Sequence, residues 1–281
     1  MNVTVSVPGK VILMGDHAVV HGKPALVAAI NKRMYVTYGG KLAKTDQYVR
    51  AIKDLLERQF RYNIPRLGIA ISTDVPQGYH LGTSAMVAVG TIAAILYATK
   101  KIWNPERVNR LAYEAEKIQH GTPSGVDNTI VTFGGLLWYR KELEFLKSMW
   151  QLSFKPSKKL HNFFLIKTTK PAESTGEMVH LVGQKVKQDG VRMDLVFAKN
   201  EIQTRRLTVA LKEGNERALI DAMRMGEATL EEMGVVSEKV KPLIRKIEKS
   251  GGAAKILGGG GLADGVGYLL CYHRNPPTGP D

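Results

Sequence analysis

Hydrophobic and polar positions in the first half of the chain follow two different periods. Alternation with period two predicts strands, and apolar positions three or four residues apart predict helices. Strand-like segments are expected at residues 3–7, 10–14, 25–30, 34–38 and 67–72, with a turn at Pro8-Gly9 separating the first two. Helices are expected at residues 46–60, 84–98 and 104–121. The helix at 84–98 is apolar nearly all round, which predicts that it is buried.

The second half is mainly helical and closes with strands. Ser174-x-x-Glu177 is a capping-box pattern that opens one helix, a second helix is expected to end near Gly234, and a third stops at Gly251. Strands are expected at residues 163–167, 253–257 and 266–272. Both halves therefore have an α+β pattern. The charged, aromatic stretch 140–159 is the expected crossing between two domains, residues 1–155 and 156–281.

Charge is high but evenly spread. The 281 residues carry a net charge of +14, and the sequence pI is about 9.7. Residues 1–140 hold 17 basic and 9 acidic side chains, and residues 141–281 hold 23 and 17. Such a diffuse excess suits attraction of an anionic small molecule. A nucleic-acid-binding protein, the alternative from another class, would interleave stacking aromatic residues with cations, and only a loose cluster at Trp138, Tyr139 and Trp150 is present.

Composition excludes several other classes. A single cysteine, Cys271, excludes a disulfide framework and a multi-cysteine metal site. The longest nearly apolar run, residues 85–98, is too short to span a bilayer, and the N-terminus lacks a signal-peptide pattern. We expect a cytoplasmic protein that does not enter a membrane.

A glycine-rich segment at residues 76–85, Pro-Gln-Gly-Tyr-His-Leu-Gly-Thr-Ser-Ala, leads into the buried helix. Glycines let successive backbone N–H groups converge, and the helix start adds further donors, so this segment can hold a polyphosphate. A hydroxyl such as Ser84 can reach a phosphate-bound Mg²⁺. The alternative is that Thr83 or Ser84 only caps the helix.

A second segment, Glu116-x-x-x-His120 followed by Gly-Thr-Pro-Ser-Gly-Val-Asp127-Asn, brings two carboxylates onto adjacent elements. One can hold a metal and the other can face a substrate hydroxyl. Ser124-x-x-Asp127 also fits a capping box, which would give Asp127 a purely structural role. A third segment pairs Lys10 with Gly15-Asp16-His17.

Together these segments resemble the GHMP small-molecule kinases. Residues 8–22 resemble the first motif of that family, and Ala-Val-Val-His-Gly at 18–22 is the form found in mevalonate kinases. Residues 76–85 resemble the ATP-binding motif, 120–128 the segment with the catalytic aspartate, and 255–261 the third, glycine-rich motif. The resemblance implies a two-domain fold, with an N-terminal ribosomal-protein-like domain, a ferredoxin-like C-terminal domain and the site in the cleft between them.

The resemblance also implies ATP- and Mg²⁺-dependent phosphorylation of the C5 hydroxyl of mevalonate. Asp127 would be the catalytic aspartate with Lys10 beside it, Ser84 and Glu116 would hold Mg²⁺, and Asp16 and His17 would contact mevalonate. ATP would be bound by Pro76, Gly78, His80, Leu81, Gly82, Thr83, Ser84, Ala85, Gly259 and Gly260. A homodimer is implied as well. A related kinase acting on phosphomevalonate, homoserine or a sugar stays open as the nearest alternative.

Four positions depart from the family pattern. His80 stands where a glycine is usual, Thr83 replaces a serine, Asp16 replaces a glutamate, and Leu257 precedes the glycines where a hydroxyl is usual. These differences bear on substrate choice more than on phosphoryl transfer.

Overall fold

The computed structural model describes residues 2–39, 46–65, 67–121 and 123–275. The chain forms two compact units. Unit 1 comprises residues 1–10, 28–77 and 81–135, and unit 2 comprises residues 11–27, 78–80 and 136–281. The expected division at residue 155 differs from this grouping, because residues 11–27, 78–80 and 136–155 join unit 2. It stays a prediction about domain boundaries.

The larger sheet is built around two long strands, β1 and β2. Its strands pair in the order β1-β2-β4-β5, and β3 pairs with β2. The strands are β1 (Val3–Met14), β2 (Pro24–Tyr38), β3 (Ile69–Thr73), β4 (Leu136–Lys141) and β5 (Lys147–Gln151). The predicted break at Pro8-Gly9 is wrong, because β1 continues through it. β1 lies at the edge of the sheet, where proline is tolerated because one side of the strand has no partner strand.

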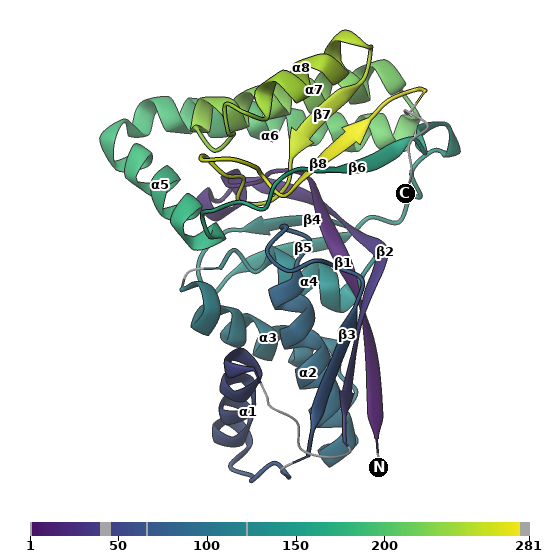
Figure 1. The fold of residues 1–281 in the computed structure, drawn as a ribbon, viewed down its shortest axis with the longest axis vertical. Coiled ribbons are helices and arrows are strands. Elements are labelled where there is room, and N and C mark those ends of the chain that lie inside the picture. Colours follow the sequence, from purple (N-terminus) through teal and green to yellow (C-terminus); the bar gives the residue numbers. More distant parts are fainter. Residues whose placement is uncertain (1, 40–45, 66, 122, 276–281) are drawn as a thin grey trace. The chain divides into compact units, whose positions relative to one another are not determined.

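The described residues of unit 1 include four helices that lie together in Figure 1. They are α1 (Gln47–Phe60), α2 (Thr83–Lys100), α3 (Pro105–His120) and α4 (Val126–Phe133). The sequence predicted the first three to within two residues. Asp46 caps α1 and Asn104 caps α3, each by accepting a backbone N–H of the first turn. The helix α4 was not predicted as a separate element.

The helix α2 is the core of unit 1. Its residues 85–96 are all buried, as its apolar composition predicted. By length and composition it could also cross a membrane, but 67% of it is buried inside the protein. Burial of this kind is typical of a core helix.

The described part of unit 2 combines a three-stranded antiparallel sheet with three long helices and a shorter one, α8. The sheet has the order β6-β8-β7, with β6 (Phe163–Lys167), β7 (Ala253–Ile256) and β8 (Tyr268–Tyr272). The helices are α5 (Thr175–Gln188), α6 (Gly190–Glu213), α7 (Glu216–Met233) and α8 (Lys241–Lys249). Two short 3₁₀ helices, η1 (Ala18–His21) and η2 (Lys158–Leu160), complete the unit.

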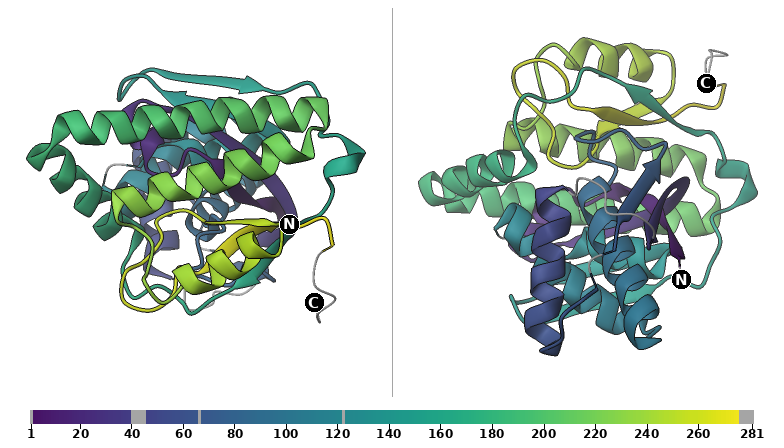
Figure 2. Two further views of the ribbon diagram at one scale, coloured as in Figure 1. Left: turned by 90° about the horizontal axis from the view of Figure 1, so that it is seen from above. Right: turned by 60° about the horizontal axis from the view of Figure 1, so that its bottom comes forward.

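The core of unit 2 lies where these helices cover the sheet. Figure 2 shows α6 and α7 side by side, and Phe197 and Met233 are buried between the helices and strands such as β7. The predicted capping box is confirmed, because Ser174 accepts from the N–H of Glu177 and the Glu177 carboxylate accepts from the N–H of Ser174. The predicted helix end at Gly234 is confirmed as well.

Candidate functional site

In unit 1, the loop before α2 ends in a left-handed glycine. Gly82 is the residue before the first turn of α2 and has φ 83°. A Cβ atom at Gly82 would lie 2.8 Å from Cγ of Lys10, so only glycine leaves room for that side chain. The N–H of Lys10 donates to the carbonyl of Leu81 at 3.1 Å. The loop is therefore fixed directly against Lys10.

The hydroxyl groups at the start of α2 do not cap the helix. Among the described residues no side chain makes a capping hydrogen bond to α2, so the helix-cap alternative for Thr83 and Ser84 is wrong. The Ser84 hydroxyl instead donates to Oε1 of Glu116, which projects from α3. Ala85 and Leu81, the neighbours in this segment, are buried.

Glu116 lies at the centre of a small polar cluster. Only 4% of the residue is exposed, and burial is the main cause that raises the pKa of its carboxyl group. The phenol of Tyr48 donates to Glu116 Oε1 at 2.8 Å. His120 Nε2 lies 3.1 Å from Ser84 Oγ and 3.7 Å from Glu116 Oε2.

This cluster fits a magnesium ion bound together with a nucleotide. No group of three or more His, Cys, Asp or Glu side chains that could hold a metal occurs among the described residues. Mg²⁺, however, commonly takes one or two protein oxygen ligands and completes its shell with phosphates and water. A hydroxyl and a buried carboxylate are suitable oxygen donors, and a buried negative charge is stabilised by a cation. Ser84 and Glu116 therefore fit the predicted role.

A second pair in unit 1 joins Lys10 to Asp127. Lys10 Nζ lies 3.0 Å from Asp127 Oδ1, and the two side chains are 3% and 34% exposed. The predicted capping box at Ser124 is wrong, because the residue before α4 is Gly125, with φ 86°, and Asp127 lies inside the first turn. The Ser124 hydroxyl accepts from the N–H of Val126 instead. The start of α4 and the ammonium group of Lys10 both stabilise negative charge on Asp127.

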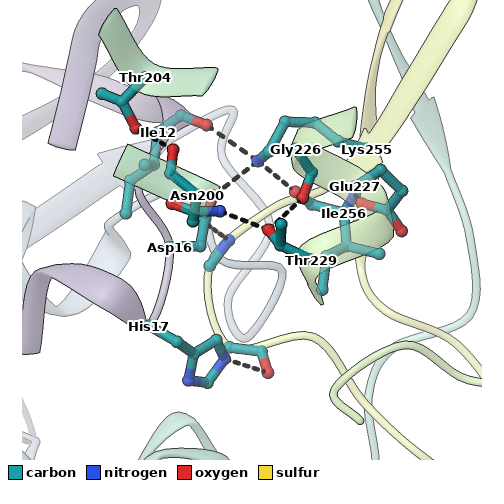
Figure 3. A network of polar contacts seen from close by, with 12 residues as sticks. Ile12, Asp16, His17, Asn200, Thr204, Gly226, Glu227, Thr229, Lys255 and Ile256 are labelled. Carbon is teal, nitrogen blue, oxygen red and sulfur yellow. Dashed lines mark hydrogen bonds and ion pairs between the residues drawn. The ribbon is translucent and has the colours of Figure 1, made fainter. Parts of the chain in front are cut away.

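In unit 2, both oxygens of the Asp16 carboxylate accept hydrogen bonds from other residues of the unit. Lys255 Nζ donates to Asp16 Oδ2 at 2.6 Å, and the N–H of Gly258 donates to Asp16 Oδ1 at 2.7 Å. The side chains of Asp16 and Lys255 are both 0% exposed. Figure 3 shows Lys255 reaching Asp16 together with the carbonyl groups of Ile12 and Ile256.

His17 leaves one ring nitrogen without a partner. Its Nε2 lies 3.1 Å from the carbonyl oxygen of Gly259, which can only accept, so Nε2 carries the proton. Its Nδ1 is then an acceptor, and it is buried without a hydrogen-bond partner in the described part of the chain. Burial lowers the pKa of His17, which keeps Nδ1 unprotonated.

The unusual His80 is also bound to the third glycine motif. His80 Nε2 lies 3.1 Å from the carbonyl oxygen of Gly260, and Nδ1 lies 3.4 Å from Oγ1 of Thr175. A Cβ atom at Gly258 would lie 2.7 Å from Cβ of His80, so the motif leaves space that the imidazole fills. Gly78 belongs to the same unit as His80, whereas Pro76 belongs to unit 1.

Each unit thus collects its own set of predicted residues. Unit 1 brings together two pairs, Lys10 with Asp127 and Ser84 with Glu116, beside the loop that holds Leu81, Gly82, Thr83 and Ala85. Unit 2 brings together Asp16, His17, His80, Gly259 and Gly260. Thr122, inside the segment with the aspartate, lies outside the described residues.

Three polar residues of these clusters were not predicted from the sequence. Tyr48, Lys255 and Glu227 all contact predicted residues or their neighbours. Glu227 is fully buried on α7, accepts from the N–H of Ile256 at 2.9 Å, and has its pKa raised to about 8 chiefly by burial. A polar residue at an otherwise apolar helix position was the available signal for Glu227. Tyr48 offered no signal, because nothing in its helix marks it.

Comparison with known proteins gives the family. Residues 47–135 match the GHMP kinases N terminal domain. Mevalonate kinase of Archaeoglobus fulgidus is 31% identical over 278 residues, which cover 91% of this chain and 88% of that protein. Mevalonate kinase of Thermococcus gammatolerans is 26% identical, with 98% of this chain and 90% of that protein covered.

A solved structure agrees in fold. The crystal structure of L. major mevalonate kinase in complex with R-mevalonate has a TM-score of 0.79 at 22% identity and covers 98% of this chain and 88% of its own. The predicted fold class is confirmed by this likeness. With the near-complete sequence match to the archaeal relatives, these findings show that the chain belongs to the mevalonate kinase family of GHMP kinases.

Proposed function

We propose that this chain transfers the γ-phosphoryl group of ATP to the C5 hydroxyl of mevalonate. The single observation that carries the proposal is the Lys10–Asp127 pair, which combines a 3% exposed lysine with a carboxylate that is one-third exposed. The names of the archaeal relatives support mevalonate as the substrate. The reaction breaks the bond between the γ-phosphorus and the bridging oxygen of ATP and forms a bond from that phosphorus to the C5 oxygen.

Asp127 is the residue that we assign to the acceptor hydroxyl. Its carboxylate can accept the hydrogen of that hydroxyl, orient the oxygen for attack and take up the proton as the new bond forms. Lys10 pairs with the Asp127 carboxylate and limits its rotation through the 3.0 Å contact. Because Lys10 is fixed by Leu81 and Gly82, the pair is held in place before substrate binds.

The loop before α2 is assigned to the phosphates of ATP. The N-terminus of α2 carries unpaired N–H groups and a partial positive charge, which suit an anionic group. Pro76, Gly78, His80, Leu81, Gly82, Thr83, Ser84 and Ala85 form the proposed segment, and Gly259 and Gly260 contribute from the third motif. Ser84 and Glu116 would hold Mg²⁺, which supplies charge neutralisation for the phosphates.

His17 and Asp16 are assigned to mevalonate in different ways. The unpartnered Nδ1 of His17 is a buried acceptor that suits a substrate hydroxyl. Asp16 already accepts from Lys255 and from the N–H of Gly258, so its contribution is to hold the loop beside His17. Assembly as a homodimer, a cytoplasmic location and the lack of a membrane role remain predictions.

A substrate panel tests the proposal directly. Purified protein is incubated with ATP and Mg²⁺ and, in separate reactions, with mevalonate, phosphomevalonate, homoserine and galactose, while release of ADP is followed by a coupled assay. We expect turnover with mevalonate, with 5-phosphomevalonate as the product by mass spectrometry. If another alcohol is phosphorylated and mevalonate is not, the chain has a different GHMP kinase activity.

A further inference from the structure

We propose that Tyr48 is a positioning residue for the magnesium ion, acting through the carboxylate of Glu116. The inference rests on the proposed function, because it assumes that Ser84 and Glu116 hold the metal. Tyr48 lies on α1, the helix that begins at Gln47, whereas Ser84 and Glu116 lie on α2 and α3. A third helix is therefore assigned a part in the metal site.

The hydrogen bonds around Glu116 define which atoms are available. Oε1 accepts from both the Ser84 hydroxyl and the phenol of Tyr48, the latter at 2.8 Å. A carboxylate that receives two donors on one oxygen cannot rotate without breaking both bonds. Its Oε2 is thereby kept on the side of His120, at 3.7 Å from the ring nitrogen.

The hydrogen bonds of the Ser84 hydroxyl also define which of its lone pairs is available. Its one proton is directed to Glu116, so the nearby Nε2 of His120, 3.1 Å away, must be the donor in that contact. A hydroxyl oxygen has two lone pairs, and one of them remains for a further ligand. Tyr48 and His120 together therefore orient one lone pair of Ser84 and one oxygen of Glu116.

Tyr48 is well suited to hold this geometry. The side chain of Asp46 accepts from the N–H of Tyr48 at 2.8 Å, and the next residues on the inner face, Val49 and Ile52, are buried. The first turn of α1, which carries Tyr48, is thus held by the Asp46 cap and by the buried side chains that follow.

Tyr48→Phe removes the phenolic oxygen alone and is the direct test. Mutation of a residue that hydrogen-bonds to a metal ligand typically lowers metal affinity or activity by about 10- to 100-fold. We expect the Mg²⁺ concentration for half-maximal rate, at fixed ATP, to rise about 10-fold, while the mevalonate KM stays unchanged. A second readout needs no turnover. The EPR titration of Mn²⁺ with the non-hydrolysable analogue AMPPNP should show weaker binding of the Mn²⁺ complex to the variant by about the same factor.

Tyr62→Phe is the matched control, since Tyr62 is 39% exposed and lies just beyond the end of α1. It should change neither readout. If Tyr48→Phe lowers thermal stability and kcat but leaves both metal readouts unchanged, Tyr48 only packs, and the inference is wrong.

Glu116→Gln separates this inference from the proposed function. A shift in the metal readouts with Glu116→Gln, without one in Tyr48→Phe, overturns the role of Tyr48 and leaves the metal site standing. If neither variant shifts them, the assignment of Mg²⁺ to Ser84 and Glu116 fails, and the inference fails with it. Shifts in both variants, with Tyr62→Phe unchanged, support the positioning role.

Discussion

The two units each contain a buried lysine paired with an aspartate, and the pairs differ in exposure. In unit 1, Lys10 and Asp127 are 3.0 Å apart, and a third of the Asp127 side chain is exposed. In unit 2, Lys255 and Asp16 are 2.6 Å apart, and neither side chain is exposed. We call Lys10–Asp127 the open pair and Lys255–Asp16 the closed pair.

The difference follows from what else each carboxylate touches. Asp16 receives Lys255 on one oxygen and the N–H of Gly258 on the other, so both oxygens are used within the protein. Asp127 lies on the first turn of α4 with part of its surface accessible. An accessible carboxylate can exchange a proton with a ligand, whereas a closed ion pair fixes the segments that it joins. We therefore expect the open pair to govern rate and the closed pair to govern stability.

The largest expected effect tests the open pair. Asp127→Asn keeps the size of the side chain but removes its negative charge and its ability to take up a proton. General acid–base groups typically contribute about 10²- to 10⁴-fold to rate, so kcat in the coupled ADP assay should fall within that range. The melting temperature should fall less than in a variant of the Lys255–Asp16 pair, because water can reach Asp127. Near-wild-type turnover in this variant would refute the assigned role of Asp127.

A change in the closed pair should mainly lower the free energy of unfolding. Lys255→Met leaves the Asp16 carboxylate buried without its cation, and removal of one partner of a buried ion pair typically costs about 3–5 kcal/mol. Denaturation in urea should show this loss in the free energy of unfolding. Lys10→Met should cost less, because water can reach Asp127.

A double variant provides the control for this comparison. Asp16→Asn in the Lys255→Met background removes the uncompensated charge and should recover part of the lost stability. If Lys10→Met and Lys255→Met destabilise the protein equally, the distinction between an open and a closed pair is wrong.

The sequence predicted much of the local structure for physical reasons that are visible in it. The predicted capping box at Ser174 and the all-apolar helix α2 depend on neighbouring residues only. The predicted breaks at Pro8-Gly9 and after residue 30 were wrong, because strand pairing carries β1 and β2 through them. Pairing between distant strands cannot be deduced from a local pattern.

Contacts between distant residues of the site could not be deduced from local patterns either. The motif residues were predicted individually, but Tyr48 and Lys255, the partners of Glu116 and Asp16, were not. Tyr48 is 68 positions from Glu116, and Lys255 is 239 positions from Asp16. Both helix-cap alternatives were reasonable from spacing alone. They are wrong because a glycine precedes each helix, and the side chains of Ser84 and Asp127 reach other elements.

The last expected effect is smallest near pH 5 and grows as the pH rises, and it concerns Glu227, a fully buried carboxyl group of unit 2. Burial raises its pKa to about 8 from the ordinary value of 4.5, so the folded protein binds a proton there that the unfolded chain releases. Stability from this group is present at low pH and is lost as pH rises toward 8, by up to about 1.4 kcal/mol per pH unit. Glu227→Gln keeps an acceptor for the N–H of Ile256 but cannot ionise. The variant should match the wild type near pH 5 and become the more stable protein as pH rises, in urea denaturation measured across this range. The exposed Glu232→Gln serves as control, and parallel pH profiles for wild type and Glu227→Gln would show that Glu227 is already ionised in the fold.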